Sequence, residues 1–204
     1  VDVGIYFSVF HKKKFVIYMK VIGISGLPGS GKSFISKYSE EKGYLVTNMG
    51  DVIREEAKKR GEDTGTTATN LRLEHGQYVV AKFTIEKVKN LIETAEDKEN
   101  LIIVEGIRSP FEVELFKEDF PDFTLLSVFA SPETRFQRIT SRGRGDDTQD
   151  INAFRLRDKR ELDFGIGNVI ATSDYIIVNE TTFDEYNKKI DEFFDKILNH
   201  ETIY

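Results

Sequence analysis

Short apolar runs alternate with amphipathic stretches from Met19 to the end of the chain. Runs of about four to eight residues rich in Val and Ile predict strands, and the stretches between them have the longer period of helices. The predicted strands are Val21–Ser25, Tyr44–Thr47, Leu101–Val104, Thr124–Ala130 and Tyr175–Val178. Alternating strands and helices are typical of an α/β fold. We therefore expect a five-stranded parallel sheet flanked by helices, in a single domain over residues 19–204.

Helix signals fill most of the intervals between these strands. Ser109-Pro110-Phe111-Glu112 is a capping box with proline in the first turn, and Ser131-Pro132 repeats the start signal. The polar stretch Glu62–Thr69 is predicted to be a loop. The other predicted helices are Lys32–Glu41, Asp51–Arg60, Leu71–Glu96, Glu133–Ser141, Ile151–Leu162 and Phe183–Leu198.

The first eighteen residues have a different pattern. The apolar stretch Val1–Phe10 precedes the basic cluster Lys12–Lys14, which reverses the order of a secretory signal peptide. We interpret residues 1–18 as an N-terminal extension upstream of a natural start at Met19. The alternative is an edge strand or a homodimer contact formed by Ile5–Phe10.

Composition narrows the class of protein. Apolar residues make up 39% and charged residues 31% of the 204 residues, the formal net charge is −6, and there is no cysteine. The lack of cysteine excludes disulfides, thiol catalysis and a cysteine zinc site. No apolar run reaches the ~20 residues of a membrane helix, and the basic residues form no long block. We expect a cytoplasmic protein without a membrane partner, and a nucleic-acid partner is disfavoured.

The strongest chemical motif follows the first predicted strand. Gly26–Ser33 reads Gly-Leu-Pro-Gly-Ser-Gly-Lys-Ser and matches the G-x-x-x-x-G-K-S phosphate-binding loop, or P-loop. Backbone N–H groups of such a loop converge on the phosphates, and the following helix adds its positive end. We predict that ATP binds here. The predicted contacts come from Gly26, Gly29, Ser30, Gly31, Lys32 and Ser33, with Lys32 at the β- and γ-phosphates.

A P-loop also needs groups that orient Mg²⁺. The Ser33 hydroxyl is one predicted ligand. Glu105 follows the apolar run Leu101–Val104 and precedes Gly106, so it is placed at a strand end next to the loop. We predict that Ser33 and Glu105 hold the magnesium ion. The alternative for Glu105 is an ordinary surface glutamate.

Several segments together resemble known small-molecule kinases. Val21–Ser33, Leu45–Arg54, Val104–Ser109 and Arg135–Arg160 follow the order found in nucleoside-monophosphate kinases and dephospho-CoA kinases. From Met19 onward the chain resembles an archaeal family of P-loop proteins that are similar to those kinases. This resemblance implies a P-loop fold of the nucleoside-monophosphate-kinase type with a lid, a magnesium-dependent kinase activity and a nucleotide-like acceptor.

The resemblance also implies roles at the acceptor site. Asn48–Arg54 is similar to a segment of adenylate kinases whose arginine holds the acceptor phosphate, and Arg108 matches a second such arginine. Asp51 matches the aspartate that dephospho-CoA kinases place as a base for a hydroxyl acceptor. Its alternative is to cap a helix Val52–Arg60. The acceptor-binding helices are expected over about residues 49–98.

A charged, glycine-rich segment at about residues 141–150 is predicted to be a lid that excludes water during transfer. Arg138, Arg142 and Arg157 flank it and are predicted to stabilise charge on the transferred phosphoryl group. Ordinary helix ion pairs are the alternative. Asn179 ends the last predicted strand, where related kinases meet the adenine ring, and is a candidate ATP contact.

Three functions remain open from the sequence, and one of them is a non-catalytic nucleotide sensor that binds ATP without turnover. The leading hypothesis is an ATP-dependent phosphotransferase acting on a nucleotide or a nucleotide-like small molecule. The alternative is an ATPase switch that acts on a protein or RNA partner, because the acceptor segments depart from both kinase patterns. Guanine specificity is not predicted, since no N-K-x-D motif is present.

Overall fold

The computed structural model describes residues 19–94, 101–142 and 149–199. These residues form one sheet of five strands: β1 (Lys20–Ser25), β2 (Leu45–Asn48), β3 (Leu101–Ile107), β4 (Phe123–Phe129) and β5 (Tyr175–Val178). The strand order is β2-β3-β1-β4-β5, and every neighbouring pair is parallel. The predicted fold class, a five-stranded parallel α/β sheet, is confirmed.

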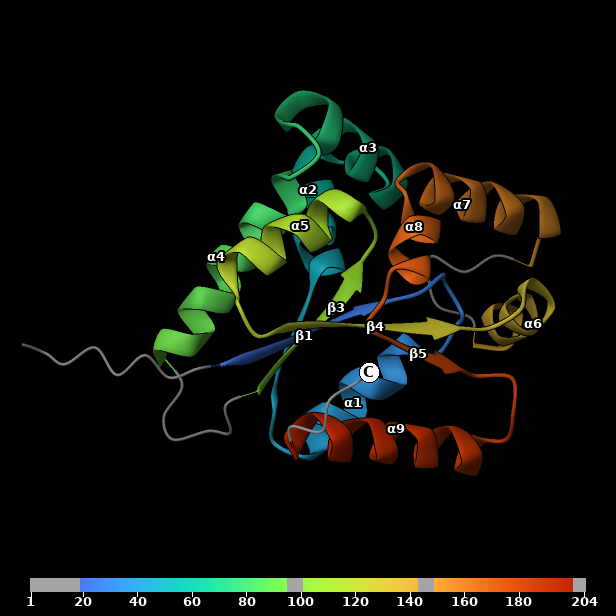
Figure 1. Cartoon of the computed structure of the whole chain (residues 1–204). Helices are drawn as coiled ribbons and strands as arrows, with labels where there is room; N and C mark the ends of the chain where they lie inside the picture. Colours follow the sequence, from blue (N-terminus) through green and yellow to red (C-terminus); the bar gives the residue numbers. More distant parts are fainter. Residues whose placement is uncertain (1–18, 95–100, 143–148, 200–204) are drawn as a thin grey trace, which may run out of the picture.

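Helices cover both faces of this sheet (Figure 1). On one face lie α2 (Met49–Arg60), α3 (Thr64–His75), α4 (Val79–Thr94), α5 (Pro110–Asp119) and α8 (Ile166–Ala171). The opposite face carries α1 (Lys32–Glu41) and α9 (Phe183–Leu198). Two buried clusters result, one around Val104 and Phe116 and the other around Ile22 and Phe193. Burial on both faces explains why the central strands read as continuous apolar runs.

The carboxyl ends of the strands meet at one edge of the sheet, where α6 (Pro132–Arg142) and α7 (Ile151–Asp163) also lie (Figure 1). There the pairing of β1 with β3 shifts register between Ile24 and Ser25. The Ser25 hydroxyl donates a 2.8 Å hydrogen bond to the Ile107 carbonyl across this shift. Ligands of open α/β sheets bind at this edge, and the segments that carry the predicted site converge on it.

Two predictions between β2 and β3 were wrong, one of a loop and one of a helix. The stretch predicted to be a loop, Glu62–Thr69, contains the start of α3, because the Asp63 carboxylate caps it by accepting from the N–H groups of Gly65 and Thr66. The predicted single helix Leu71–Glu96 is two helices in the described residues. Gly76 ends α3 with a positive φ of 86°, a conformation that glycine adopts without steric cost.

Two smaller predictions also need correction. Helix α2 is capped by Asn48, whose side chain accepts from the Gly50 N–H at 2.7 Å, so the proposed capping role of Asp51 is wrong. Asp51 lies inside the first turn instead. The short helix α8 was not predicted, because its six residues carry too little periodicity to show. The capping box at Ser109 and the bounds of α9 are confirmed.

Some predictions fall outside the described residues: the N-terminal extension, the dimer contact at Ile5–Phe10 and the centre of the lid, residues 143–148.

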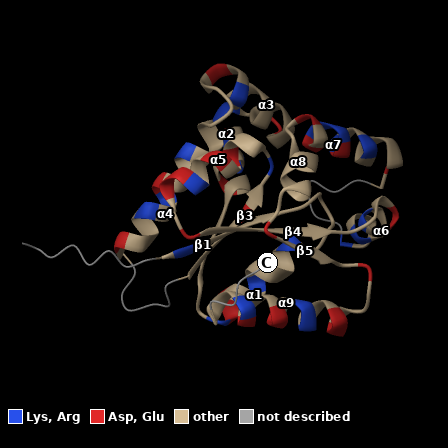
Figure 2. Cartoon of the chain, in the orientation of Figure 1, with Lys and Arg blue, Asp and Glu red and all other residues tan. Residues whose placement is uncertain are grey.

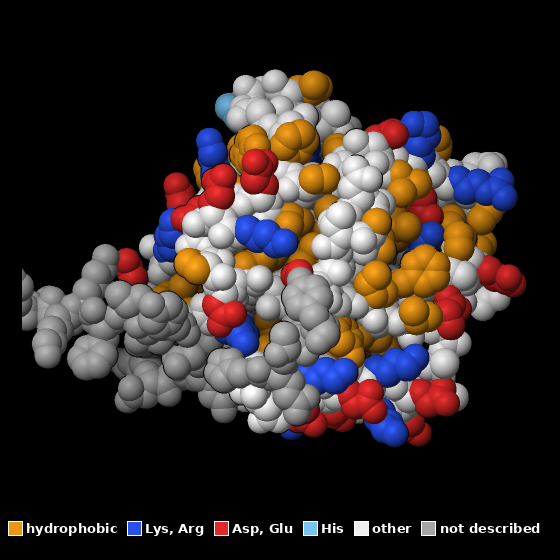
Figure 3. All heavy atoms as spheres, in the orientation of Figure 1, with side chains coloured by type: hydrophobic (Ala, Val, Ile, Leu, Met, Phe, Trp, Pro, Cys, Tyr) orange, Lys and Arg blue, Asp and Glu red, His pale blue; other side chains and the backbone are white. Residues whose placement is uncertain are grey.

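The surface of the described residues is mixed in charge. Lys and Arg alternate with Asp and Glu on the outer helices (Figure 2), and Lys188 pairs with Glu192 on α9. In the space-filling view apolar side chains also reach the surface (Figure 3). Exposed apolar side chains of the chain include Phe129 on β4 and Val178 on β5. Within the part of the chain that the structure describes, no helix has the length and apolarity to span a membrane.

Candidate active site

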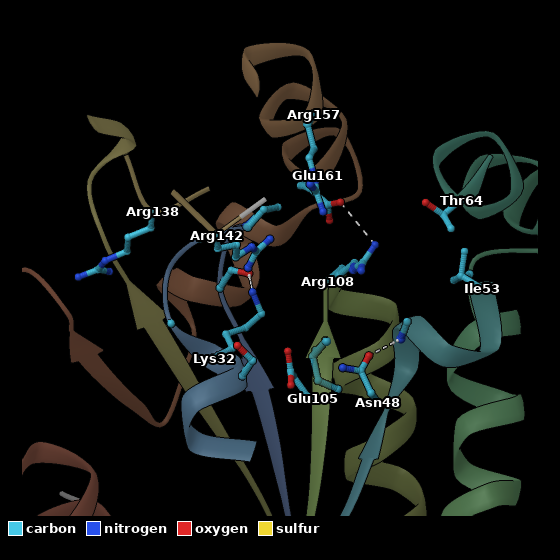
Figure 4. Close-up of a pocket in the computed structure, with 18 of the residues that line it drawn as sticks. Lys32, Asn48, Ile53, Thr64, Glu105, Arg108, Arg138, Arg142, Arg157 and Glu161 are labelled. Atoms are coloured by element: carbon cyan, nitrogen blue, oxygen red, sulfur yellow. Dashed lines mark hydrogen bonds and ion pairs between the residues drawn. The ribbon is translucent and has the colours of Figure 1, made fainter. Parts of the chain in front are cut away.

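One cleft of about 960 Å³ opens at the carboxyl edge of the sheet (Figure 4). The P-loop, the ends of β2 and β3, and helices α2, α3, α6 and α7 contribute its lining. Ser30, Asp51 and Asn179 do not line it. The predicted residues that the fold brings together in the lining are Gly26, Gly29, Gly31, Lys32, Ser33, Arg54, Glu105, Arg108, Arg138, Arg142 and Arg157.

The P-loop has a backbone shape that fits an anion. Gly29 and Gly31 have φ values of 82° and 111°, which side-chain-bearing residues rarely adopt. A Cβ on Gly31 would also lie 2.3 Å from the Asn179 amide nitrogen. The loop then runs directly into α1, whose first N–H groups are free of side-chain caps. This arrangement suits phosphate binding at the helix start.

The Lys32 ammonium group is folded back onto the loop that precedes it. Its Nζ donates to the carbonyl oxygens of Gly26 at 2.6 Å and Leu27 at 3.2 Å. Burial lowers the pKa of Lys32 to about 8, with the neighbouring Glu105 opposing the shift and Arg108 adding to it. Lys32 is therefore predominantly charged at neutral pH. Its ammonium group now binds two uncharged carbonyl oxygens, which the negatively charged oxygens of a bound phosphate could replace.

Glu105 lies inside β3 beside the P-loop (Figure 4), because the strand continues to Ile107 rather than ending at Val104 as predicted. One of its carboxylate oxygens accepts a 2.6 Å hydrogen bond from the hydroxyl of Ser36, on the second turn of α1. Together with the Ser33 hydroxyl it offers oxygen ligands of the kind Mg²⁺ prefers. Among the described residues no group of three or more His, Cys, Asp or Glu could hold a metal. This donor set fits an ion that takes its remaining ligands from phosphates and water.

Asn179, the predicted adenine contact, lies beneath the P-loop rather than in the cleft. Its amide nitrogen donates to the Ser30 carbonyl at 2.8 Å, and its oxygen accepts from Arg138 at 3.2 Å. Tyr186 donates to the Gly31 carbonyl at 3.1 Å from the same side. Arg138 lines the cleft but also reaches the carbonyls of Ser30 and Asn179. These hydrogen bonds to the Ser30 and Gly31 carbonyls support the backbone of the P-loop.

A buried arginine that the sequence reading did not single out joins the P-loop to α7. Arg135 is 1% exposed and donates to the Pro28 carbonyl at 3.1 Å and the Ala130 carbonyl at 3.1 Å. Its guanidinium also binds both carboxylate oxygens of Asp158, at 2.8 and 2.5 Å. The guanidinium also lies over the ring of Phe154. The position of α7 relative to the loop is thus fixed by a bidentate ion pair.

The predicted acceptor arginines face the cleft from the other side. Arg54 pairs with Asp51 at 2.5 Å, which leaves Asp51 outside the lining. Arg108 pairs with Glu161 of α7 at 3.4 Å (Figure 4). Each arginine is held by a carboxylate that an anionic ligand would have to replace.

The backbone that carries Arg108 is anchored by a second buried ion pair. Glu112 is fully buried, and one of its oxygens accepts from the N–H groups of Arg108 at 2.6 Å and Ser109 at 3.1 Å. The other oxygen accepts from Arg72 of α3 at 2.7 Å. Helix α3, which supplies Thr64, Gly65 and Ala68 to the cleft, is thereby tied to the β3–α5 turn.

Comparison with known proteins places the chain in a family. A protein of Methanothermobacter thermautotrophicus described as a UPF0200 protein is 49% identical over 179 residues, 88% of this chain and 91% of that protein. A UPF0200 protein of Thermococcus onnurineus is 43% identical, covering 87% of this chain and 98% of that one. The chain belongs to the UPF0200 family. The family model described as an AAA domain matches residues 25–155, which span the P-loop and most of the cleft.

Solved structures relate this family's fold to that of P-loop kinases. TT1252 from Thermus thermophilus superposes with a TM-score of 0.62 at 16% identity, covering 88% of this chain and 98% of that one. Shikimate kinase from Acinetobacter baumannii, in complex with shikimate, superposes with a TM-score of 0.55 at 15% identity and covers 90% and 95%. At this identity the likeness shows the fold alone: the chain has a P-loop kinase-like fold, as the resemblance implied.

Several residues of the site were missed from the sequence. Ser36 lies one turn after Ser33 on the predicted first helix, so its proximity to the P-loop could have been found from helical spacing. Glu161, which also lines the cleft, was not predicted to be a site residue. The bonds of Arg135 and Glu112 join segments between 23 and 107 residues apart, and no local pattern reports such contacts.

Proposed function

We propose that the protein is an ATP-dependent phosphotransferase that moves the γ-phosphoryl group to a phosphate-bearing small molecule, a nucleotide or a nucleotide-like compound. The observation that carries the proposal is that one cleft is lined both by Lys32 of the P-loop and by Arg54 and Arg108 opposite it. A phosphate acceptor is already anionic, so it needs cationic groups to hold it rather than a base.

The carboxylates of the cleft support a phosphate acceptor over a hydroxyl acceptor. Among the described lining residues only Glu105 and Glu161 carry carboxylates, and they accept from Ser36 and Arg108 respectively. Asp51, the base that a hydroxyl acceptor would need, is bound to Arg54 outside the lining. A general base contributes about 10²- to 10⁴-fold to such a reaction, so its absence from the cleft weighs against a hydroxyl.

The chemistry assigned to these residues is electrostatic. An oxygen of the acceptor phosphate attacks the γ-phosphorus in line, the bond to the bridging oxygen of ADP breaks, and no proton is transferred. Lys32 exchanges its two carbonyl partners for phosphate oxygens, while Arg108, released from Glu161, holds the acceptor phosphate. Arg142 and Arg157 line the same cleft and would stabilise the charge that spreads over the transferred group. Ser33 and Glu105 would hold Mg²⁺, which supplies charge neutralisation at the phosphates.

The proposal is tested by measuring ADP formation with and without a panel of acceptors that includes nucleoside monophosphates and dephospho-CoA. The Lys32→Ala variant is the control for contaminating activity. Acceptor-dependent ADP formation that disappears in the variant supports a kinase. Turnover that no small acceptor changes, but that an RNA or protein fraction stimulates, supports the ATPase switch instead.

A further inference from the structure

Arg160 of α7 lines the cleft and is half-buried, yet within residues 19–94, 101–142 and 149–199 its guanidinium makes no ion pair or hydrogen bond. Its neighbours differ in this respect. Arg54 is held by Asp51, Arg108 by Glu161 and Arg135 by Asp158. Half-buried guanidinium groups normally have hydrogen-bond partners, since desolvating their donors without compensation is unfavourable.

The guanidinium of Arg160 packs over the backbone of α3 at Gly65. A Cβ at Gly65 would lie 2.3 Å from Nη1 and 2.8 Å from Cζ of Arg160. Any side chain at this position would push the guanidinium away. Thr64 and Gly65 also line the cleft. The lack of a side chain at Gly65 therefore leaves room for the Arg160 guanidinium in the part of the cleft proposed to bind the acceptor.

Asp63, whose carboxylate also lies close to Gly65, forms no ion pair with Arg160. Asp63 attracts it electrostatically, but the Asp63 oxygens accept from the N–H groups of Gly65 at 2.8 Å and Thr66 at 3.0 Å and from the Thr66 hydroxyl. These bonds hold the carboxylate in its capping position at α3. The donors of Arg160 therefore stay available to a ligand in the cleft.

We propose that Arg160, seated over Gly65, forms a subsite for a second anionic group of the acceptor, a phosphate or a carboxylate. The inference rests on the proposed function. In Figure 4 Thr64 lies on the side of the cleft away from Lys32, with Arg108 between them. A reacting phosphate held by Arg108 next to the γ-phosphate leaves Arg160 for a different group of the same molecule.

This subsite defines a substrate class. The acceptor is a small molecule with two separate anionic groups, one that receives the phosphoryl group and one that Arg160 binds. A simple nucleoside monophosphate has only one phosphate, and that phosphate is the reacting group. Such a compound fills the Arg108 position and leaves Arg160 unpaired.

The test compares two ligands that differ by one phosphate. Adenosine 5′-monophosphate and adenosine 3′,5′-bisphosphate are titrated by calorimetry into full-length protein saturated with Mg²⁺ and a non-hydrolysable ATP analogue. A charge-assisted hydrogen bond is expected to make the bisphosphate bind about tenfold more tightly or better. Arg160→Met abolishes this preference. Arg155→Met, which removes an exposed arginine of the same helix that does not line the cleft, preserves it.

Two glycine variants test the position of the Arg160 guanidinium more mildly than removing it. Gly65→Ala displaces the guanidinium and is expected to reduce the preference about threefold, by weakening one charged contact. Gly167→Ala is the matched control, because a Cβ on this helical glycine would meet Leu162 at an ordinary 3.5 Å. Equal binding of the two ligands by wild-type protein, or an undiminished preference in Arg160→Met, overturns the proposal.

Failure of the proposed function would look different from failure of the subsite. If no acceptor stimulates ADP formation but the bisphosphate preference is present and depends on Arg160, the anion subsite stands and the kinase assignment falls. If an acceptor is phosphorylated while both ligands bind equally, the kinase assignment stands and the subsite falls.

Discussion

Arg135 and Asp158 form a bidentate ion pair, at 2.8 and 2.5 Å, between the helix that packs on the P-loop and the helix that carries Arg157, Arg160 and Glu161. The same guanidinium donates to the Pro28 carbonyl of the loop. Buried ion pairs contribute little net stability compared with apolar residues of similar size. We infer that this pair serves to align α7 with the phosphate loop.

Breaking this pair is expected to reduce both stability and activity. Asp158→Asn leaves the buried Arg135 without its counter-charge and should lower the free energy of unfolding by about 3 kcal/mol. Urea unfolding and acceptor-dependent ADP formation measure the two effects. The exposed pair Lys159–Asp163 is the control, since Lys159→Ala should cost less than about 1 kcal/mol.

A double variant separates alignment from stability. Arg135→Met with Asp158→Leu replaces the pair by apolar side chains and is expected to recover much of the stability. Activity should remain at least about tenfold below that of the wild type, because a misplaced catalytic group loses rate steeply. Recovery of full activity along with stability would mean that the pair has only a structural role.

Ser36 is expected to affect Mg²⁺ binding through its hydrogen bond to Glu105. Removing its 2.6 Å hydrogen bond in Ser36→Ala leaves the carboxylate free to rotate, and such outer hydrogen bonds typically contribute about ten- to a hundredfold in metal affinity or activity. The Mg²⁺ concentration for half-maximal activity should rise accordingly. Ser39→Ala removes a buried hydroxyl one turn farther along, bonded only within α1, and should leave the Mg²⁺ titration unchanged.

Asp51 distinguishes the two kinds of acceptor. If it only holds Arg54, Asp51→Asn should raise the acceptor KM by about threefold to tenfold, the loss expected for a weakened charged contact, and leave kcat nearly unchanged. A catalytic base would show the opposite pattern, a fall of about 10²-fold or more in kcat. Steady-state kinetics with varied acceptor decides between them.

Asn179 gives a test of the adenine contact predicted from the sequence. Its side chain bonds to Ser30 and Arg138 in the structure, so Asn179→Ala should weaken ATP and GTP binding equally, by about tenfold, through loss of support for the loop. Fluorescence titration with both nucleotides measures this. A change in the ratio of the two affinities would instead show that Asn179 reads the base.

The sequence predicted the features that depend on local patterns. The P-loop, the parallel sheet and the capping box at Ser109 each have a signature within a few residues. The start of α3 was missed because threonine and glycine around Thr66 resemble a loop, while the Asp63 cap decides otherwise. The break at Gly76 was passed over because a single glycine is tolerated within a helical pattern.

The sequence predicted less about the part of the cleft that is proposed to bind the acceptor. The sequence indicated Arg54 and Arg108, and the partner of Arg54, Asp51, is three residues away on the same helix. The partner of Arg108, Glu161, and the absence of Asp51 from the lining are facts of three-dimensional placement. The same holds for Arg160, whose relation to Gly65 joins residues 95 positions apart. Such contacts depend on how α2, α3 and α7 pack, which spacing along the chain does not encode.

The central claim is that one cleft transfers a phosphoryl group from ATP to an acceptor. The most direct measurement follows γ-labelled ATP in a single turnover with the acceptor panel, comparing wild-type protein with Lys32→Ala. We expect label in an organic phosphate product with wild-type protein and none with the variant. Label that appears only as inorganic phosphate, whatever acceptor is supplied, would contradict it.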